Sequence, residues 1–323
     1  METMRDIKIR LKSIDSTRQI TQSMRLISNR KVQKMKRRME ENRQYLEESV
    51  RIVDGILSGP RFDLKNHVYI NPGARRIPEG LPGSGGAVVI IITGDRGLCG
   101  GYNANAERKA AELMKGLDES GKPVRLIAVG SKGGDYFRRR QRNIIKAYKG
   151  LSENPFHEDA YNICKIVADM YIKGETSEVY LVYTQYNSML TQTPKTLKLL
   201  PIEPGVIREK LEEIKAKPKK SEKSDGNGDG GSPGEKIRAM SYDPAESVFF
   251  EYAAASYISS ALFGAMLESA TCEQCARLTG MDSAVKNSEK IIDSLTLQYN
   301  QMRQGAITQE IAEIVGGANA VSE

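Results

Sequence analysis

Residues 3–59 read TMRDIKIRLKSIDSTRQITQSMRLISNRKVQKMKRRMEENRQYLEESVRIVDGILSG, a stretch without proline whose first glycine is Gly55. Apolar side chains recur in it at three- and four-residue steps, as in the seam of a coiled coil or helical bundle. Thr3 and Asp6 have the spacing of an N-terminal cap. A single helix of this length would measure roughly 80 Å, so it needs a second long helix to cover its apolar seam. The predicted seam residues are Ile7, Leu11, Ile14, Met24, Ile27, Val32, Met35, Met39, Leu46, Val50, Val53 and Leu57.

A second long helical pattern occupies residues 243–323. Asp243, Pro244 and Glu246 are typical of a helix start, with an Asp cap, proline at the first position and an acid at the third. No proline follows, and the pattern continues to about Val315, a length of roughly 100 Å. We predict that this helix pairs antiparallel with the first. Its predicted seam residues are Phe250, Ala254, Tyr257, Ala261, Leu262, Met266, Leu278, Val285, Ile292, Leu295, Tyr299, Met302 and Ala306.

The middle of the chain, residues 85–205, has a different pattern. Continuous apolar runs predict strands at 87–93, 124–129 and 178–184, with a fourth near 195–202, and helical segments are expected at about 103–117, 131–149 and 157–173. This order predicts an inserted, Rossmann-like, mostly parallel α/β domain between helices 1–59 and 243–323. Residues 215–236 are polar and glycine-rich, which predicts a disordered insertion.

Net charge, apolar runs and cysteine number limit which kinds of protein this chain can be. The net charge of the 323 residues is +7, which indicates acidic partners such as nucleic acid, a lipid surface or an acidic protein. No apolar stretch follows the first charged residues, so we expect no signal peptide. The sequence also contains no run of about 18 apolar residues, so we expect no membrane-spanning helix. Four scattered cysteines suit a reducing compartment.

The loop GDRGLCGG, residues 94–101, follows a predicted strand and opens a predicted helix. Phosphate groups bind at such places in α/β proteins. The loop matches neither the P-loop pattern nor the dinucleotide-binding pattern. We therefore favour a tight turn or a protein contact over nucleotide binding.

Cys272 and Cys275 form a C-x-x-C pair, which can be redox-active or half of a zinc site. No second Cys or His pair lies at a useful spacing, so packing within a helix is favoured and no metal or cofactor is expected. Catalytic patterns are absent from the sequence, which contains only two histidines, His67 and His157. A non-catalytic protein is the prediction.

Two further features concern partners. Residues 1–38 hold 12 Lys or Arg against three acids, which suits nucleic acid, a solvated helix face or a basic shaft surrounded by acidic protein loops; we favour the last two. Residues 307–321 are apolar and rich in Ala and Gly, although chain ends are usually polar. The second helix is the longer one, so this apolar segment should extend past the pairing and suggests a socket in another protein.

Three motifs identify a resemblance. Residues 16–31 (STRQITQSMRLISNRK), 94–103 (GDRGLCGGYN) and 281–317 (from MDSAVKN through LTLQYN to RQGAITQEIAEIVGG) resemble the gamma-subunit family of the F-type ATP synthases. The resemblance implies a rotor shaft that turns inside a hexamer of alpha and beta subunits. Such a shaft would couple proton flow through the membrane c-ring to the conformational cycle of the beta subunits. The α/β domain would lie near the epsilon subunit and the ring, on the cytoplasmic face of the cell membrane.

The resemblance also assigns residues by position. Subunit contacts that couple rotation to catalysis would be made by Met24, Arg25, Arg30, Lys31, Arg303, Gln304, Thr308 and Gln309. Contacts at the foot, with epsilon or the ring, would be made by Asp95, Arg96, Tyr242 and Asp243. The alternatives are an α/β enzyme that binds a phosphate or nucleotide, and a basic coiled-coil protein that binds nucleic acid.

Overall fold

The computed structural model describes most of the chain, in two compact units. The described residues are 3–59, 67–71, 73, 86–216 and 246–322. The first unit comprises residues 1–32, 98–100 and 274–323. The second unit comprises residues 33–97 and 101–273. Each unit is described by itself below.

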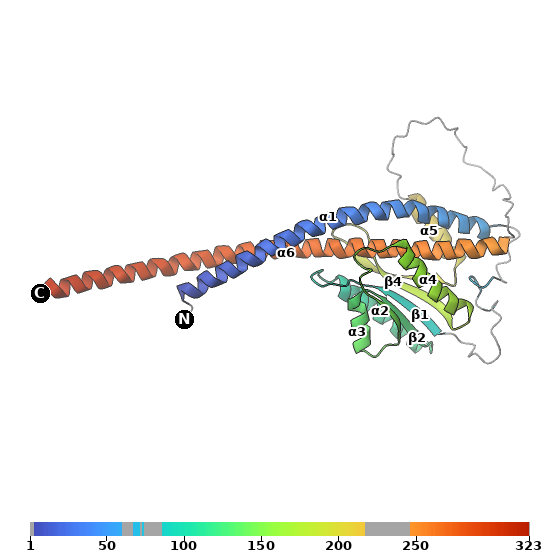
Figure 1. Cartoon of the computed structure of the whole chain (residues 1–323), viewed down its shortest axis with the longest axis horizontal. Helices are drawn as coiled ribbons and strands as arrows, with labels where there is room; N and C mark the ends of the chain where they lie inside the picture. Colours follow the sequence, from blue (N-terminus) through green and yellow to red (C-terminus); the bar gives the residue numbers. More distant parts are fainter. Residues whose placement is uncertain (1–2, 60–66, 72, 74–85, 217–245, 323) are drawn as a thin grey trace, which may run out of the picture. The chain divides into compact units, whose positions relative to one another are not determined.

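Two long helices, α1 (Met4–Leu57) and α6 (Glu246–Ser322), contribute to both units (Figure 1). The predicted cap of α1 is present: the backbone N–H and the hydroxyl of Thr3 donate to the Asp6 carboxylate at 3.0 and 2.7 Å. In the second unit the hydroxyl of Tyr45 on α1 lies 3.1 Å from the hydroxyl of Ser256 on α6. Ten residues earlier on α1, Met35 packs with Leu267, which lies later on α6 than Ser256. Residue numbers therefore run in opposite directions along the pair, which confirms the antiparallel prediction.

The predicted seam of α1 is wrong at one position. Ile27 is exposed, whereas the small polar residues Thr21 and Ser28 are buried within the first unit. Thr21, Ser28 and Val32 recur at seven- and four-residue steps, so they share one face of the helix. Small polar side chains can be buried on this face because their hydroxyl groups donate hydrogen bonds to a backbone carbonyl one turn earlier. The hydroxyl of Thr21, for example, donates to the Thr17 carbonyl at 2.8 Å.

The second unit is built around a sheet of five strands in the order β3-β2-β1-β4-β5. The strands are β1 (Gly86–Ile92), β2 (Val124–Val129), β3 (Ile144–Tyr148), β4 (Thr176–Tyr186) and β5 (Gln192–Leu200). The first four are parallel and β5 is antiparallel to β4. The predicted mostly parallel α/β domain is confirmed.

Helices cover both faces of this sheet, which explains why all seven residues of β1 are buried. The shorter helices are α2 (Tyr102–Glu119), α3 (Ser131–Arg139), α4 (His157–Ile172) and α5 (Pro204–Ala216). Met114 of α2 and Phe137 of α3 pack with Val89 in one apolar cluster. Residues of α4, α6 and the end of α1 pack against the opposite face in a larger cluster.

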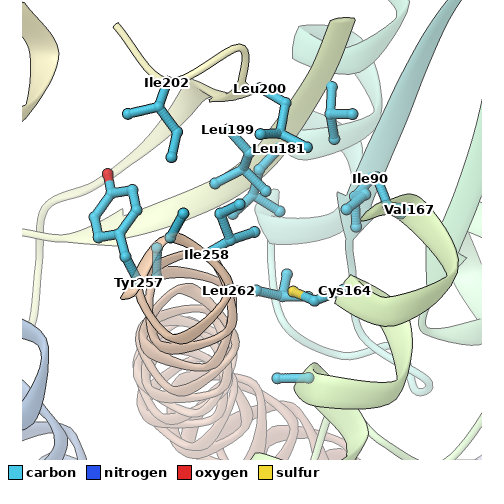
Figure 2. Packing of buried hydrophobic residues seen from close by; sticks show 14 of the residues in the cluster. Ile90, Cys164, Val167, Leu181, Leu199, Leu200, Ile202, Tyr257, Ile258 and Leu262 are labelled. Atoms are coloured by element: carbon cyan, nitrogen blue, oxygen red, sulfur yellow. The ribbon is translucent and has the colours of Figure 1, made fainter. Parts of the chain in front are cut away.

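Figure 2 shows how α6 enters that larger cluster. Tyr257, Ile258 and Leu262 of α6 lie beside the strand residues Leu181 and Leu199. In the same view the α4 side chains of Cys164 and Val167 border this cluster. The first part of α6 is thus a core helix of the second unit, buried on nearly all its faces from Tyr257 to Glu273.

Two element predictions need correction. Residues 131–149 are not one helical segment: α3 ends at Arg139, Gln141 has a φ of +55°, and Ile144–Tyr148 form β3. Helix α5 was not predicted, and it includes Lys215 and Ala216 of the expected insertion. The remainder of that insertion, together with the helix start at 243–245, lies outside the described residues. Among the described helices none has a segment apolar enough to cross a bilayer.

Candidate functional site

The carboxylate of Asp95 joins three loops of the second unit. Its Oδ1 accepts hydrogen bonds from the backbone N–H and the hydroxyl of Ser131, at 2.9 and 2.7 Å. Its Oδ2 accepts from the Gly150 N–H at 3.0 Å and from the Ser152 hydroxyl at 2.7 Å. These residues follow β1, β2 and β3. One side chain therefore ties together the carboxyl ends of three neighbouring parallel strands.

Electrostatics favour the ionised form of this carboxyl group. Burial acts to raise the pKa of Asp95, but hydrogen bonds from Ser131, Ser152 and Gly150 hold it below its ordinary value. The N–H of Ser131 belongs to the first residue of α3, where a related α/β fold would bind a phosphate. Asp95 supplies an anion from the chain itself at that helix end. A bound phosphate would meet its negative charge, so the structure favours the packing role of the loop.

Other residues of the same loop also serve packing. The side chain of Asn103 accepts from the Gly94 N–H at 2.8 Å and donates to the Arg96 carbonyl at 3.3 Å. A Cβ at Gly94 would lie 2.9 Å from the carboxylate carbon of Glu273, so only glycine allows α6 to approach here. Arg96 is 75% exposed and its Nε lies 3.0 Å from Glu153. Of the two predicted foot residues in this loop, Asp95 positions the loop and Arg96 faces outward.

An ion pair links the two helices in the first unit. Arg25 of α1 donates to Asp282 of α6 at 2.9 Å, and Lys286 lies 2.8 Å from the other oxygen of that carboxylate. Hydrogen bonds from Lys286 and Arg25 lower the pKa of Asp282. Buried residues of this unit include Ile7, Thr21, Ser28 and Val32 on α1, and Cys275, Met281, Val285 and Leu295 on α6. The pairing of the two helices in this unit thus combines apolar burial with the ion pair between Arg25 and Asp282.

The proposed coupling residues lie in the first unit on both helices. On α1, Met24, Arg25 and Lys31 are half-buried and Arg30 is exposed. On α6, four exposed side chains project from the helix: Arg303, Gln304, Thr308 and Gln309. The structure brings Arg25 to a partner on α6, and Thr308 donates to the Gln304 carbonyl of its own helix. Tyr242 and Asp243 lie outside the described residues.

The last part of α6 has an exposed apolar stripe. Ile307, Ile311, Ile314 and Val315 are 46%, 57%, 71% and 53% exposed. Their steps of four, three and one place them on one face of the helix. The helix is paired further back, where Leu295 is buried. Within the described part of the first unit, the predicted apolar extension past the pairing is therefore confirmed.

A second exposed apolar stripe was not predicted. Ile9, Ile20 and Ile27 of α1 are exposed, with Leu26 beside them. Steps of 11 and seven residues return to nearly the same helix face. Assigning Ile27 to the seam concealed this pattern. The first unit thus presents apolar side chains outward from both of its helices.

Both cysteines of the C-x-x-C pair are buried. Cys272 is buried in the second unit, where its thiol lies 3.5 Å from the Thr184 carbonyl, and Cys275 is buried in the first unit. All four cysteines are free thiols. Burial raises the pKa of the Cys164 thiol to about 12, which makes it a poor nucleophile. In the described ranges no group of His, Cys, Asp and Glu is arranged to hold a metal ion.

Comparison with known proteins identifies relatives along the whole chain. The model of a family described as ATP synthase matches residues 3–321. An ATP synthase gamma chain of Alkaliphilus metalliredigens is 38% identical over 98% of both chains. A sodium-ion-specific ATP synthase gamma chain of Acetobacterium woodii is 37% identical over 99% of both.

Solved structures agree in fold. A chain of the Euglena gracilis mitochondrial ATP synthase has a TM-score of 0.62 at 19% identity, covering 98% of this chain and 94% of that one. A chain of the Tetrahymena thermophila central stalk and c-ring has a TM-score of 0.54 at 19% identity, covering 82% and 99%.

Proposed function

The chain belongs to the ATP synthase gamma-chain family, and on this premise we propose that it is the central shaft of a rotary ATP synthase. The observation that carries the proposal is the first unit: two antiparallel helices paired through a buried seam, with α6 extending past the pairing as an exposed apolar stripe. Such a stripe needs a protein cover in water. A hexamer of alternating alpha and beta subunits would supply it.

In this role the chain transmits force and performs no chemistry. Rotation of the shaft presents different side chains to each beta subunit, so that each angle stabilises one beta conformation over the others. The shaft must be asymmetric for this to work. The exposed stripe on α1, which includes Ile20, and the stripe on α6, which includes Ile311, give it an uneven apolar surface.

We propose two groups of contacts with other subunits. The sleeve contacts are Met24, Arg25, Arg30, Lys31, Arg303, Gln304, Thr308 and Gln309, supported by the exposure of most of them and by the family motifs that contain them. At the foot, Arg96 would contact the epsilon subunit or the c-ring directly, while Asp95 would hold its loop in place. Tyr242 and Asp243 are assigned to the foot by resemblance alone.

The cellular setting is part of the same proposal. The protein would be a peripheral subunit on the cytoplasmic face of the cell membrane, reaching the bilayer only through the c-ring. We propose proton flow as the driving reaction. Collapsing the proton gradient with a protonophore while a sodium gradient is maintained should stop ATP synthesis in vesicles that contain the complex; continued synthesis would assign sodium instead.

Assembly with alpha and beta subunits tests the shaft proposal. The purified chain is mixed with an alpha–beta preparation, and a stable complex with increased ATPase activity is expected. A variant with Ile311→Asp and Ile314→Asp should fold normally yet form a weaker complex, because it charges the apolar stripe. ATPase activity of the chain alone would favour the enzyme alternative. Salt-sensitive DNA binding without assembly would favour the nucleic-acid alternative.

A further inference from the structure

Strand β3 forms one edge of the sheet in the second unit. It pairs with β2 from Leu126–Ile144 to Val129–Tyr148, and within the described residues no strand pairs with its other side. An edge strand presents unpaired backbone N–H and C=O groups that a further strand can bind. The edge of β3 therefore has the backbone chemistry to accept an extended polypeptide.

Positive charge is concentrated around the same strand. Residues 131–149 hold seven Lys or Arg and one acid, a net charge of +6, compared with +7 for the whole chain. In the described part of the chain, three acids interact with these cations in the pairings that follow: Asp135 pairs with Arg138, Asp118 pairs with Arg142, and Glu107 lies near Arg140 and Lys132. Seven cations against these three acids still leave a charge of +4. The local ion pairs therefore do not neutralise the surface.

The cations lie on both sides of the edge. Helix α3, which ends in Arg138 and Arg139, packs on one face of the sheet, where Phe137 and Ile144 share an apolar cluster. On the other face, Lys146 of β3 lies 4.9 Å from the ring centre of Tyr148, which packs against the larger cluster. A strand added to β3 would have positive charge above and below it.

Some of this surface is already rigid. The guanidinium of Arg140 lies 3.6 Å from the ring centre of Tyr136. Gln141, with its φ of +55°, turns the chain between α3 and β3. Such fixed cations lose little side-chain entropy when they bind a carboxylate. The surface is preorganised for an anionic partner.

We propose that the outer edge of β3, flanked by Arg139 and Lys146, docks an extended acidic segment of another subunit by strand addition. Backbone hydrogen bonds would give affinity and alternate acidic side chains would give specificity. A lipid surface suits the site less well, because residues 131–149 include no exposed large apolar side chain that could enter a bilayer. The inference rests on the proposed role as a subunit of a larger complex.

A labelled peptide of alternating Glu and Val tests the docking surface on the full chain. Its affinity should fall about tenfold or more when Arg139→Glu and Lys146→Glu are combined, because two attractive charges become repulsive. The matched control reverses two lysines of α2, the half-buried Lys109 and the exposed Lys115 (Lys109→Glu with Lys115→Glu), and should change affinity less than about twofold. A similar loss in both double variants would overturn the proposal, since it would indicate a general charge effect.

Hydrogen–deuterium exchange tests the strand addition itself. Bound peptide should slow amide exchange in residues 143–148, and a peptide with proline in place of each valine should not, because proline lacks the backbone donor. Unchanged exchange with the Glu-Val peptide would overturn the proposal. Binding to vesicles of phosphatidylcholine and cardiolipin without binding to the peptide would also overturn it, in favour of a lipid surface.

The two proposals fail in different ways. If the chain binds the peptide at β3 but never assembles with alpha and beta subunits, the shaft role is wrong and the docking surface stands. If it assembles and supports ATPase activity but shows no peptide binding, the docking surface is wrong and the shaft role stands.

Discussion

Two regions of α6, residues 257–273 and residues 303–318, differ in how much of their surface is buried. From Tyr257 to Glu273 the helix is buried on nearly every face, and polar residues such as Ser260 and Glu273 are buried with it. From Arg303 to Ala318 almost every residue is exposed, including four large apolar ones. One part supports a fold and the other presents a surface. Burial in the chain alone therefore separates the residues needed for folding from those available to partners.

Truncation in the buried part should have the largest effect. Leu262→Ala removes a fully buried side chain from the larger cluster, and the free energy of unfolding should fall by about 2–5 kcal/mol. Urea unfolding of the purified chain measures this change. A loss below about 1 kcal/mol would mean that α6 is not a core helix of the second unit.

Removing the charge of Asp95 should have the next largest effect. Asp95→Asn keeps the shape but weakens four hydrogen bonds to an ionised group, so we expect a loss of about 1–3 kcal/mol in unfolding free energy at pH 7. A loss within experimental error would contradict the role of Asp95 in joining the three loops.

The pH dependence of that loss has a defined sign. The pKa of Asp95 is lowered in the folded chain, so its ionised form stabilises the fold fully above the ordinary Asp pKa of about 3.9. This contribution is lost as pH falls through the lowered value. The difference between wild type and Asp95→Asn should stay constant from about pH 5 to pH 8 and narrow below about pH 4. Urea unfolding at several pH values checks it, and a difference that widens in acid would refute the assignment.

Truncation in the exposed part should barely affect folding. Ile314→Ala should change the unfolding free energy by less than about 0.5 kcal/mol, because the side chain is 71% exposed. It should nevertheless weaken the complex with alpha and beta subunits, as measured by the dissociation rate on an immobilised hexamer. Unchanged dissociation would show that this part of the stripe is not covered in the complex.

The smallest effect is expected at the crossing of the two helices. Asp282→Asn removes the partly exposed ion pairs with Arg25 and Lys286, and such pairs contribute little to stability. The melting temperature of the chain should stay within experimental error of wild type. A clear drop would mean that the pairing of α1 and α6 in the first unit depends on charge more than on apolar burial.

Patterns of apolar residues predict most of the fold. Helices α1 and α6, the parallel strands β1, β2 and β4, and the apolar extension past Leu295 all follow from the spacing and length of apolar runs. Strand β3 was missed because its five residues follow a run of arginines that suits a helix, and the left-handed turn at Gln141 has no signal in the residue type. Thr21 and Ser28 were missed because a seam was sought among apolar residues alone.

The candidate sites were less predictable. Sequence motifs predicted Asp95 as a foot contact, whereas its hydrogen-bond partners Ser131 and Ser152 lie 36 and 57 residues away in the sequence. Only the packing of three strand ends brings them together. The same holds for β3, whose position at the sheet edge follows from strand order and not from its own residues.

Rotation of the chain inside a hexamer tests the shaft role most directly. A bead attached to a cysteine introduced at Lys115, which is exposed on α2, would report the motion, because the four native cysteines are buried and should not be labelled. With ATP and immobilised alpha and beta subunits, the bead should turn in one direction and stop when ATP is exhausted. A chain that binds the hexamer while the bead stays fixed during ATP hydrolysis would contradict the rotary role.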